Sequence, residues 1–229
     1  MFWRIGKSEK SSFNVPRDRG RMLPYTMNRN SLFHGNLHTY DRCRIPDSYY
    51  EQVLQPALNI FDKGAVIVDV CSGVGEVAQF AQSQGFNNVL SIDISLEGLK
   101  ALLSENPQAV GINGCGYRLP LADSSVDIVH IKDGLVHFED QQSLIVEQTR
   151  ILKPGGILII VSARSGVCRD YYQTYEKKTR EEMMMAGLHP VQLFYYAPTL
   201  EETKHDWYGK NLRMNQRPET RFVLVGKKQ

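Results

Sequence analysis

The chain has 229 residues, 42% of them hydrophobic, and a net charge of +2. This length is enough for one sizeable core but short for two, so we expect a single domain with appendages. No run approaches the roughly 20 apolar residues of a membrane span. The first residues also lack the apolar stretch of a signal peptide, which predicts a cytoplasmic protein.

The positive charge is concentrated near the start of the chain. Residues 1–44 carry nine Lys or Arg residues against three acidic ones, a net charge of +6, which leaves −4 for the remainder. Such a segment is compatible with an anionic partner such as RNA, but the absence of a dense Lys/Arg run favours a solvated tail. Because periodicity is also lacking there, we predict that residues 1–46 form a basic arm or lid before a single domain over 47–229.

The first predicted helix covers residues 48–61. Ser48 and Glu51 have the spacing of a capping box, and apolar residues then recur at helical intervals. Pro56 is expected to kink this helix, because proline lacks the amide hydrogen that helix hydrogen bonding needs.

After this helix, short apolar runs alternate with amphipathic stretches, which is typical of βαβ units around a parallel sheet. The runs are rich in β-branched residues, as buried parallel strands are. The run Lys153-Pro154-Gly155-Gly156 should end the third of the helices between these strands. The predicted strands cover 65–70, 88–93, 109–113, 126–131 and 156–162, and the predicted helices cover 76–84, 96–105 and 140–152.

The last part of the chain adds a helix and two strands. The helix is predicted over 171–186 and closed by Gly187, and the strands over 191–196 and 221–226. The connection between these two strands is long and polar, so we expect either a lid or a disordered excursion there.

A glycine-rich turn follows the first strand of the sheet. Gly73 and Gly75 allow close approach of a ligand to the backbone, and the next helix begins there with unpaired amides. Asp93 follows the second strand, 20 residues after Gly73, which suits an acid that binds ribose hydroxyls. This pattern alone also fits the dinucleotide fingerprint of dehydrogenases.

Cysteine and histidine spacing predicts no metal site. The four cysteines lack any C-x-x-C pair, so we expect free thiols rather than a zinc site or a disulfide framework. His34 and His38 have a spacing that suits a metal on a helix, but no Glu or Cys partner accompanies them. The cysteines are Cys43, Cys71, Cys115 and Cys168.

Four segments in this order resemble the class I S-adenosylmethionine-dependent methyltransferase family, and the resemblance covers about residues 67–162. Ala186-Gly187-Leu188 is similar to the step before the sixth strand of that family. The four segments are VDVCSGVG (68–75), SIDIS (91–95), LPLADSSVDIVHIKDGLVHF (119–138) and RILKPGGILIIVS (150–162).

The resemblance implies a cofactor, S-adenosylmethionine, and a set of site residues. Asp69 would face the methionyl part across the glycines, Asp93 the ribose, and Ile94 the adenine. Cys115 stands where the family commonly has an acid, so adenine binding would use backbone groups beside it; a Tyr-Asp step such as Tyr40-Asp41 would lie over the cofactor. The predicted cofactor-binding residues are Asp69, Cys71, Gly73, Gly75, Asp93, Ile94, Gly114, Cys115, Lys132 and Tyr40; no metal is expected.

The resemblance predicts a Rossmann-like α/β fold: a doubly wound, mostly parallel seven-stranded sheet with a C-terminal antiparallel strand. It also predicts methyl transfer to an acceptor that the sequence does not identify. A small molecule is favoured, with RNA or protein open through the arm. Asp133 and His137 follow the fourth strand, where ligands bind in such sheets, and are the candidate bases. Two alternatives are a non-catalytic S-adenosylmethionine-binding module and an NAD-dependent oxidoreductase, although the Asp69 carboxylate would repel a pyrophosphate.

Overall fold

The computed structural model describes residues 14–18, 21–24, 47–164, 169–196 and 220–229. The chain divides into two compact units, residues 1–31 and 32–229. In the first unit, β1 (Asn14–Asp18) and β2 (Arg21–Pro24) pair antiparallel. The sequence did not predict these strands, because each is short and contains a proline. The predicted domain boundary at residue 47 stays a prediction.

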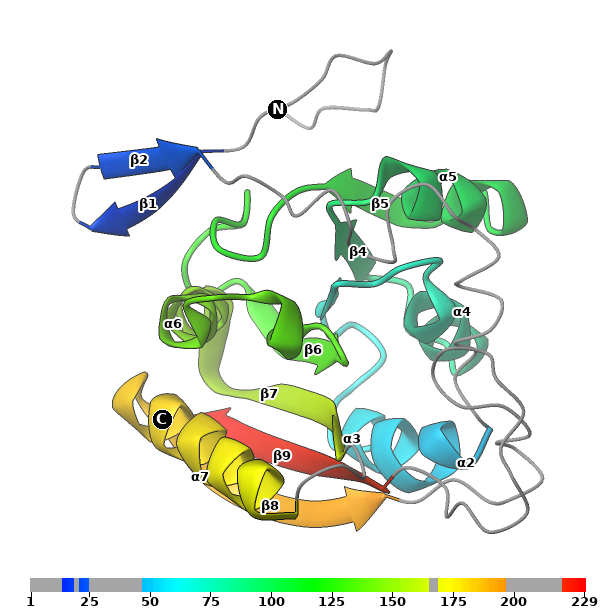
Figure 1. Cartoon of the computed structure of the whole chain (residues 1–229). Coiled ribbons are helices and arrows are strands. Elements are labelled where there is room, and N and C mark those ends of the chain that lie inside the picture. The colour runs from blue at the N-terminus through cyan, green and yellow to red at the C-terminus, as the bar shows by residue number, and fades with distance from the viewer. Residues whose placement is uncertain (1–13, 19–20, 25–46, 165–168, 197–219) are drawn as a thin grey trace, which may run out of the picture. The chain divides into compact units, whose positions relative to one another are not determined.

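The second unit contains a seven-stranded sheet in the order β5-β4-β3-β6-β7-β9-β8 (Figure 1). The strands from β3 to β7 are parallel, and β9 runs antiparallel to both β7 and β8. This topology confirms the predicted fold class. The strands are β3 (Ile67–Val70), β4 (Val89–Asp93), β5 (Val110–Asn113), β6 (Val126–Lys132), β7 (Leu152–Arg164), β8 (Leu188–Tyr196) and β9 (Thr220–Lys228).

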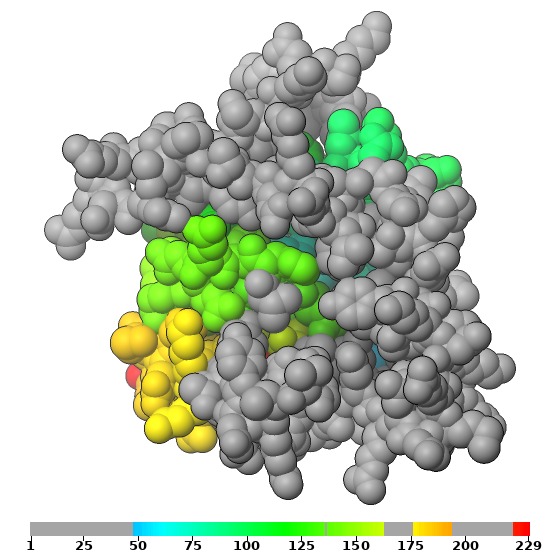
Figure 2. All heavy atoms as spheres, in the orientation of Figure 1, coloured from blue at the N-terminus to red at the C-terminus, as the bar shows by residue number. Residues whose placement is uncertain are grey.

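Helices cover both faces of the sheet, as its uninterrupted apolar strands require. One buried cluster joins the first helical segment and α4 to one face, and a second joins α6 and the end of α7 to the other. The green atoms of α6 and the yellow atoms of α7 adjoin in Figure 2. Gln142 Nε2 of α6 donates a hydrogen bond to the carbonyl oxygen of Glu182 in α7. The helices are α2 (Asp47–Tyr49), η1 (Tyr50–Leu54), α3 (Gln55–Leu58), α4 (Glu76–Ser83), α5 (Leu96–Glu105), η2 (Leu135–His137), α6 (Gln141–Ile151) and α7 (Arg169–Met185).

The first helical segment contains a π-helical turn, η1, directly before α3. Pro56 was expected to kink the helix, and in the structure the turn before it is widened into this π-helical turn. A proline ring crowds the carbonyl one turn earlier and removes one hydrogen bond, and a widened turn gives the ring room. The segment remains helical from residue 47 to residue 58, slightly shorter than predicted.

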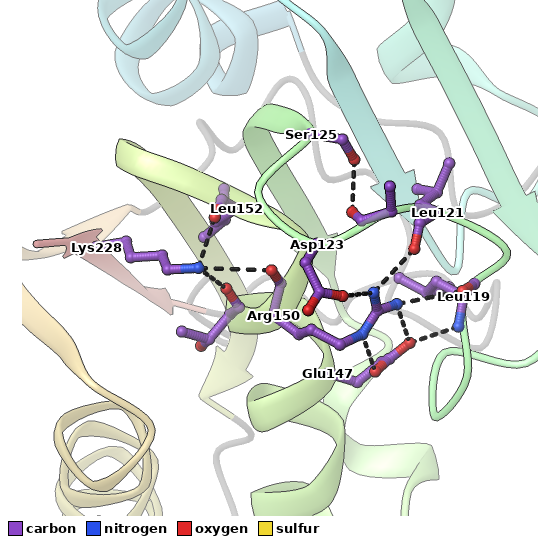
Figure 3. Close-up of polar contacts among 10 residues, drawn as sticks. Leu119, Leu121, Asp123, Ser125, Glu147, Arg150, Leu152 and Lys228 are labelled. Atoms are coloured by element: carbon purple, nitrogen blue, oxygen red, sulfur yellow. Dashed lines mark hydrogen bonds and ion pairs between the residues drawn. The ribbon is translucent and has the colours of Figure 1, made fainter.

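The end of α6 is fixed by a lysine from the last strand. Lys228 Nζ donates to the carbonyl oxygens of Thr149 and Leu152, at 2.9 and 2.7 Å (Figure 3). These carbonyls lie in and just beyond the last turn of the helix, where a positive charge is favourable. The C-terminal strand therefore holds α6 as well as closing the sheet.

Gly75 begins α4 with a left-handed φ of 79°, and a Cβ there would lie 2.3 Å from Leu102 Cδ1 of α5. We therefore expect Gly75→Ala to combine backbone strain, about 1–2 kcal/mol, with overpacking of about 1–3 kcal/mol. Urea unfolding measures the sum.

Gly155→Ala is the matched control for this substitution. Gly155 has a similar φ of 84°, but a Cβ there would meet nothing within 4 Å. Only the backbone strain should then lower the free energy of unfolding. Equal losses for the two variants would contradict the tight packing of the turn against α5.

Candidate functional site

Three parallel strands end together at the centre of the sheet. The chain passes from β3 to β4 on one side and later returns to β6 on the other, so the strand order reverses between β3 and β6. Ligands of open α/β sheets bind at the carboxyl ends of the strands beside such a reversal. The predicted site residues that follow β3, β4 and β6 are therefore brought to one edge.

The turn after β3 contains three residues in the left-handed region. Cys71, Gly73 and Gly75 have φ values of 62°, 56° and 79°. Glycine adopts this region without strain, whereas cysteine does so at an energetic cost. The amides of Cys71 and Ser72 both donate to Ile92 of β4, at 2.9 and 3.2 Å, which seats the turn against the neighbouring strand.

Asp93 joins this turn to the start of α5. Its Oδ2 accepts a hydrogen bond from the Gly73 amide at 2.8 Å, and its Oδ1 accepts one from the Ser95 amide at 2.7 Å. Ser95 in turn caps α5 by accepting from the Gly98 amide. The predicted ribose-binding acid is thus buried and also holds the glycine-rich turn in place.

Asp69 has a partner that the sequence analysis did not single out. His130 of β6 lies beside it, with Nδ1 2.7 Å from Asp69 Oδ1, and the Tyr49 hydroxyl hydrogen-bonds His130 Nε2. Burying a carboxylate costs free energy unless the group has partners. His130 meets part of that cost inside the chain. A lone histidine within an apolar strand was the signal available in the sequence.

Lys132 and Asp133 form a buried ion pair at the end of β6, with Nζ 2.6 Å from Oδ2. Asp133 has a left-handed φ of 52°, a strained conformation for a residue with a side chain. His137 follows in η2 with an exposed side chain. Desolvation by the surrounding protein lowers the pKa of the His137 imidazole, and the charge of Asp133 opposes this effect.

The segment after β5 is held by Asn113, another residue that the sequence analysis did not single out. Asn113 Nδ2 donates to the carbonyl oxygens of Asp93 and Ile94, at 3.1 and 3.0 Å. The Gly114 amide also donates to Asp93 O. The predicted adenine-side residues are thereby joined to the end of β4. Cys115, next along the chain, is buried.

Burial raises the pKa of both thiols at the site. For Cys71 the carboxylates of Asp93 and then Asp69 add to the effect of desolvation; for Cys115 a hydrogen bond from the Tyr117 backbone opposes it. Both cysteines therefore stay protonated near neutral pH, and a neutral thiol is a poor nucleophile. We assign neither of them a nucleophilic role.

Arg150 clamps the loop between β5 and β6 (Figure 3). It donates to the carbonyl oxygen of Leu121 at 2.9 Å and pairs with Asp123 and Glu147, and Glu147 accepts from the Leu119 amide. The hydrogen bond with Glu147 is the main cause that raises the pKa of the guanidinium. The clamp fixes the loop that leads away from Cys115.

Several predicted residues lie outside the described part of the chain. These include Tyr40, His34 and His38, so the lid over the cofactor stays a prediction. Within the described ranges, no cluster of three His, Cys, Asp or Glu residues could hold a metal ion. No helix of those ranges is long and apolar enough to cross a membrane.

Comparison with known proteins finds a family match over part of the chain. Residues 68–160 match the model of a methyltransferase domain, and this segment runs from β3 through most of β7. It contains nearly all of the described site residues. Over this segment the chain resembles methyltransferases in sequence, and its sheet has the fold of solved methyltransferase structures.

The sequence relatives carry methyltransferase names, and the solved structures share the fold. A demethylmenaquinone methyltransferase of Renibacterium salmoninarum is 33% identical over 97 residues, which are 42% of this chain and 40% of that protein. A structure of the Haloferax volcanii Trm112 methyltransferase activator with a putative methyltransferase has a TM-score of 0.61 at 21% identity, over 79% of this chain and 92% of the matched one. The [4+2]-cyclase SpnF has a TM-score of 0.63 at 16% identity, over 81% and 83%. The chain spans about half the length of the curated relatives it matches.

The residues at the site fit S-adenosylmethionine, the cofactor of the methyltransferases that this segment resembles. The turn presents a left-handed backbone at a helix start, and two buried carboxylates, Asp69 and Asp93, stand on neighbouring strands. Ser72 Oγ is buried in the turn without a hydrogen-bond partner in the described part of the chain. Polar atoms of this kind suit a ligand that carries hydroxyl and ammonium groups.

We expect Asp93→Asn to loosen the turn. An amide offers one acceptor oxygen where two backbone amides now donate, so one buried N–H loses its partner and the free energy of unfolding falls by about 1–3 kcal/mol. Calorimetry should also show weaker binding of S-adenosylhomocysteine.

The matched control is Asp62→Asn. Asp62 accepts a hydrogen bond from the Gly64 amide in an exposed turn, where water replaces a lost partner. That variant should stay within about 0.5 kcal/mol of the parent protein and bind the ligand equally well. An Asp93→Asn protein with unchanged stability and affinity would refute the role of Asp93.

Proposed function

We propose that this protein transfers the methyl group of S-adenosylmethionine to a small-molecule acceptor. The observation that carries the proposal is the hydrogen bond between the Asp93 carboxylate and the Gly73 amide, which joins the ends of β3 and β4 beside the reversal of strand order. It builds one polar site from the two segments that resemble the cofactor motifs of the family.

The chain's residues divide between the parts of the cofactor. The turn with Cys71, Gly73 and Gly75 would receive the methionyl part, with Asp69 facing its ammonium group. Asp93 would accept hydrogen bonds from the ribose hydroxyls, for which a carboxylate has lone pairs beyond those used by the two amides. Ile94, Gly114 and Cys115 would lie beside the adenine. Lys132, at the end of β6, would also contact the cofactor, and Tyr40 would cover it as part of the lid.

The cofactor supplies an electrophilic methyl group on a sulfonium. The chain must hold the acceptor in line with that group, and orientation of this kind lowers a barrier by several kcal/mol. A base is needed where the acceptor loses a proton. Asp133 and His137 are the candidates, since they follow β6 at the ligand-binding edge, and the lowered pKa of His137 keeps its imidazole neutral and able to accept a proton.

The relatives' names support a small acceptor. Demethylmenaquinone methyltransferases recur among them, and demethylmenaquinone is a small molecule. RNA or protein bound through the basic arm is the competing acceptor, and it predicts activity that falls steeply with added salt. The cytoplasmic location stays a prediction.

Non-catalytic binding is the competing function. SpnF, a neighbour with a similar fold, is named a cyclase, so the fold alone does not assign the reaction. Binding of S-adenosylmethionine without methyl loss over a broad acceptor panel would favour this alternative. An NAD-dependent oxidoreductase has no support in the matched family.

The first test measures the ligand and the transfer separately. Mass spectrometry of the purified protein should detect S-adenosylmethionine or S-adenosylhomocysteine, and calorimetry should show binding of both. Labelled methyl should then pass to a small acceptor, with demethylmenaquinone the first to try. A protein that binds neither ligand overturns the proposed function.

The second test is the pH dependence of kcat/KM, which reports groups of the free enzyme. If His137 is the base, kcat/KM should fall as pH drops through its pKa, and desolvation places that midpoint below the ordinary value of about 6.5. His137→Gln should remove this acid limb. A limb that persists in the variant would exclude His137.

A further inference from the structure

Three polar side chains form a hydrogen-bonded chain inside an otherwise apolar layer. Tyr49 of α2 bonds His130 of β6, and His130 bonds Asp69 of β3. Their exposed fractions are 0%, 0% and 2%. Tyr49 belongs to the hydrophobic cluster that packs the first helical segment and α4 against the sheet. Buried polar groups are tolerated when they hydrogen-bond one another, so loss of any one of these three side chains leaves a buried partner unsatisfied.

The sheet register places His130 beside Asp69. The two residues are Cα partners across β3 and β6, and Asp69 is also the partner of Ser91 in β4. Partners in a parallel sheet project to the same face. The Asp69 carboxylate therefore lies in a polar row across three strands, two residues before the left-handed turn begins. The Ser91 hydroxyl is buried without a hydrogen-bond partner in the described ranges.

Tyr49 reaches this row from a segment 81 residues away in the chain. Its ring lies edge-on to His130, with centroids 6.0 Å apart. Its neighbour Tyr50 stacks on Phe80 of α4 at 4.4 Å. Because both aromatic contacts fix the start of the first helical segment, the Tyr49 hydroxyl is held in place at His130 Nε2.

The chemistry of the three groups sets the direction of the hydrogen bonds. A carboxylate only accepts, so His130 Nδ1 must carry a hydrogen and donate to Asp69. A neutral imidazole then has an acceptor at Nε2, and the Tyr49 hydroxyl donates to it. The neutral ring with its hydrogen on Nδ1 satisfies both contacts of His130. The contact with Asp69 uses Oδ1, so Oδ2 takes no part in it.

We propose that His130 is a positioning residue, held by Tyr49, which orients the Asp69 carboxylate toward the methionyl ammonium of S-adenosylmethionine. This role rests on the proposed function, since it needs that cofactor. His130 acts through Asp69 and not by touching the ligand. Because Tyr49 belongs to α2, binding of the methionyl end of the cofactor would also depend on the position of α2.

The competing explanation is that His130 only neutralises the cost of a buried acid. In that case its loss lowers stability and affects all ligands of the site alike. A positioning role has a narrower consequence, because only ligands that carry the ammonium group lose affinity. These explanations can be separated with two ligands that share the adenosine and thioether groups, of which only one carries the amino-acid group. A positioning role predicts loss of affinity for that ligand alone.

The experiment measures binding of S-adenosylhomocysteine and 5′-methylthioadenosine to the full-length protein by calorimetry. His130→Leu removes both hydrogen bonds. It should weaken S-adenosylhomocysteine by about tenfold or more, as loss of a charged hydrogen-bonded arrangement does, and leave 5′-methylthioadenosine within about twofold. His130→Asn keeps a donor near the Nδ1 position and should restore most of the affinity. Tyr49→Phe keeps the ring and should give an intermediate loss.

Asp127→Asn is the matched control. Asp127 lies near the opposite end of β6, where it accepts from the Val66 amide and pairs with Lys153. Its replacement should lower stability and leave the affinity for both ligands unchanged. ¹⁵N NMR of the parent protein gives an independent readout, and it should show the hydrogen of His130 on Nδ1.

Three results would overturn the positioning role. They are an equal loss for both ligands in His130→Leu, an Nε2–H tautomer of His130, and a parent protein that binds S-adenosylhomocysteine no better than 5′-methylthioadenosine. In the last case adenosine binding would still support the proposed function. A parent protein that binds neither ligand overturns the proposed function itself. Where His130→Leu fails to fold, the Asn variant and the NMR spectrum decide.

Discussion

The Asp93 carboxylate holds together the loops that follow β3 and β4. Each of its oxygens accepts a hydrogen bond from a backbone amide, one from Gly73 in the turn and one from Ser95 at the start of α5. Both amides would be unsatisfied without it, and a buried unsatisfied amide is costly. Because α5 then places Leu102 against Gly75, the turn, the helix and the acid form one packed unit. That unit holds the glycine-rich turn of the site in place.

Two of the three described residues other than glycine that have a left-handed φ lie at the carboxyl edge of the sheet, and the third, Ser124, precedes β6. Cys71 and Asp133 adopt left-handed conformations at this edge, and Lys132 forms a buried ion pair with Asp133. Strain of this kind persists only where surrounding contacts hold it, and it gathers at functional sites. Away from this edge, local preferences and packing mostly agree, as in the apolar strands and capped helices. This strain supports the proposal that the edge binds a ligand.

Asp69 shows that a buried acid can serve two purposes. His130 stabilises it within the fold, so its burial alone is no evidence for a ligand. The same contact restricts the orientation of the carboxylate, and a restricted carboxylate is a better partner for a ligand ammonium than a mobile one. The resemblance to methyltransferases indicates the cofactor, whereas the reaction must be argued from the site, since chains of this fold carry other activities.

Strand periodicity and glycine spacing are local signals, so the strands from β3 to β9 and the residues of the glycine-rich turn could be predicted from the sequence, whereas β1 and β2 could not. The sequence also indicated the resemblance to methyltransferases. The folded structure was needed to show that His130 lies beside Asp69 and that Tyr49 hydrogen-bonds His130. It was also needed to show that Asn113 and Arg150 hold the segments that follow β4 and β5. These contacts join residues far apart in the chain, and they depend on strand order and register, which no local pattern of residues specifies.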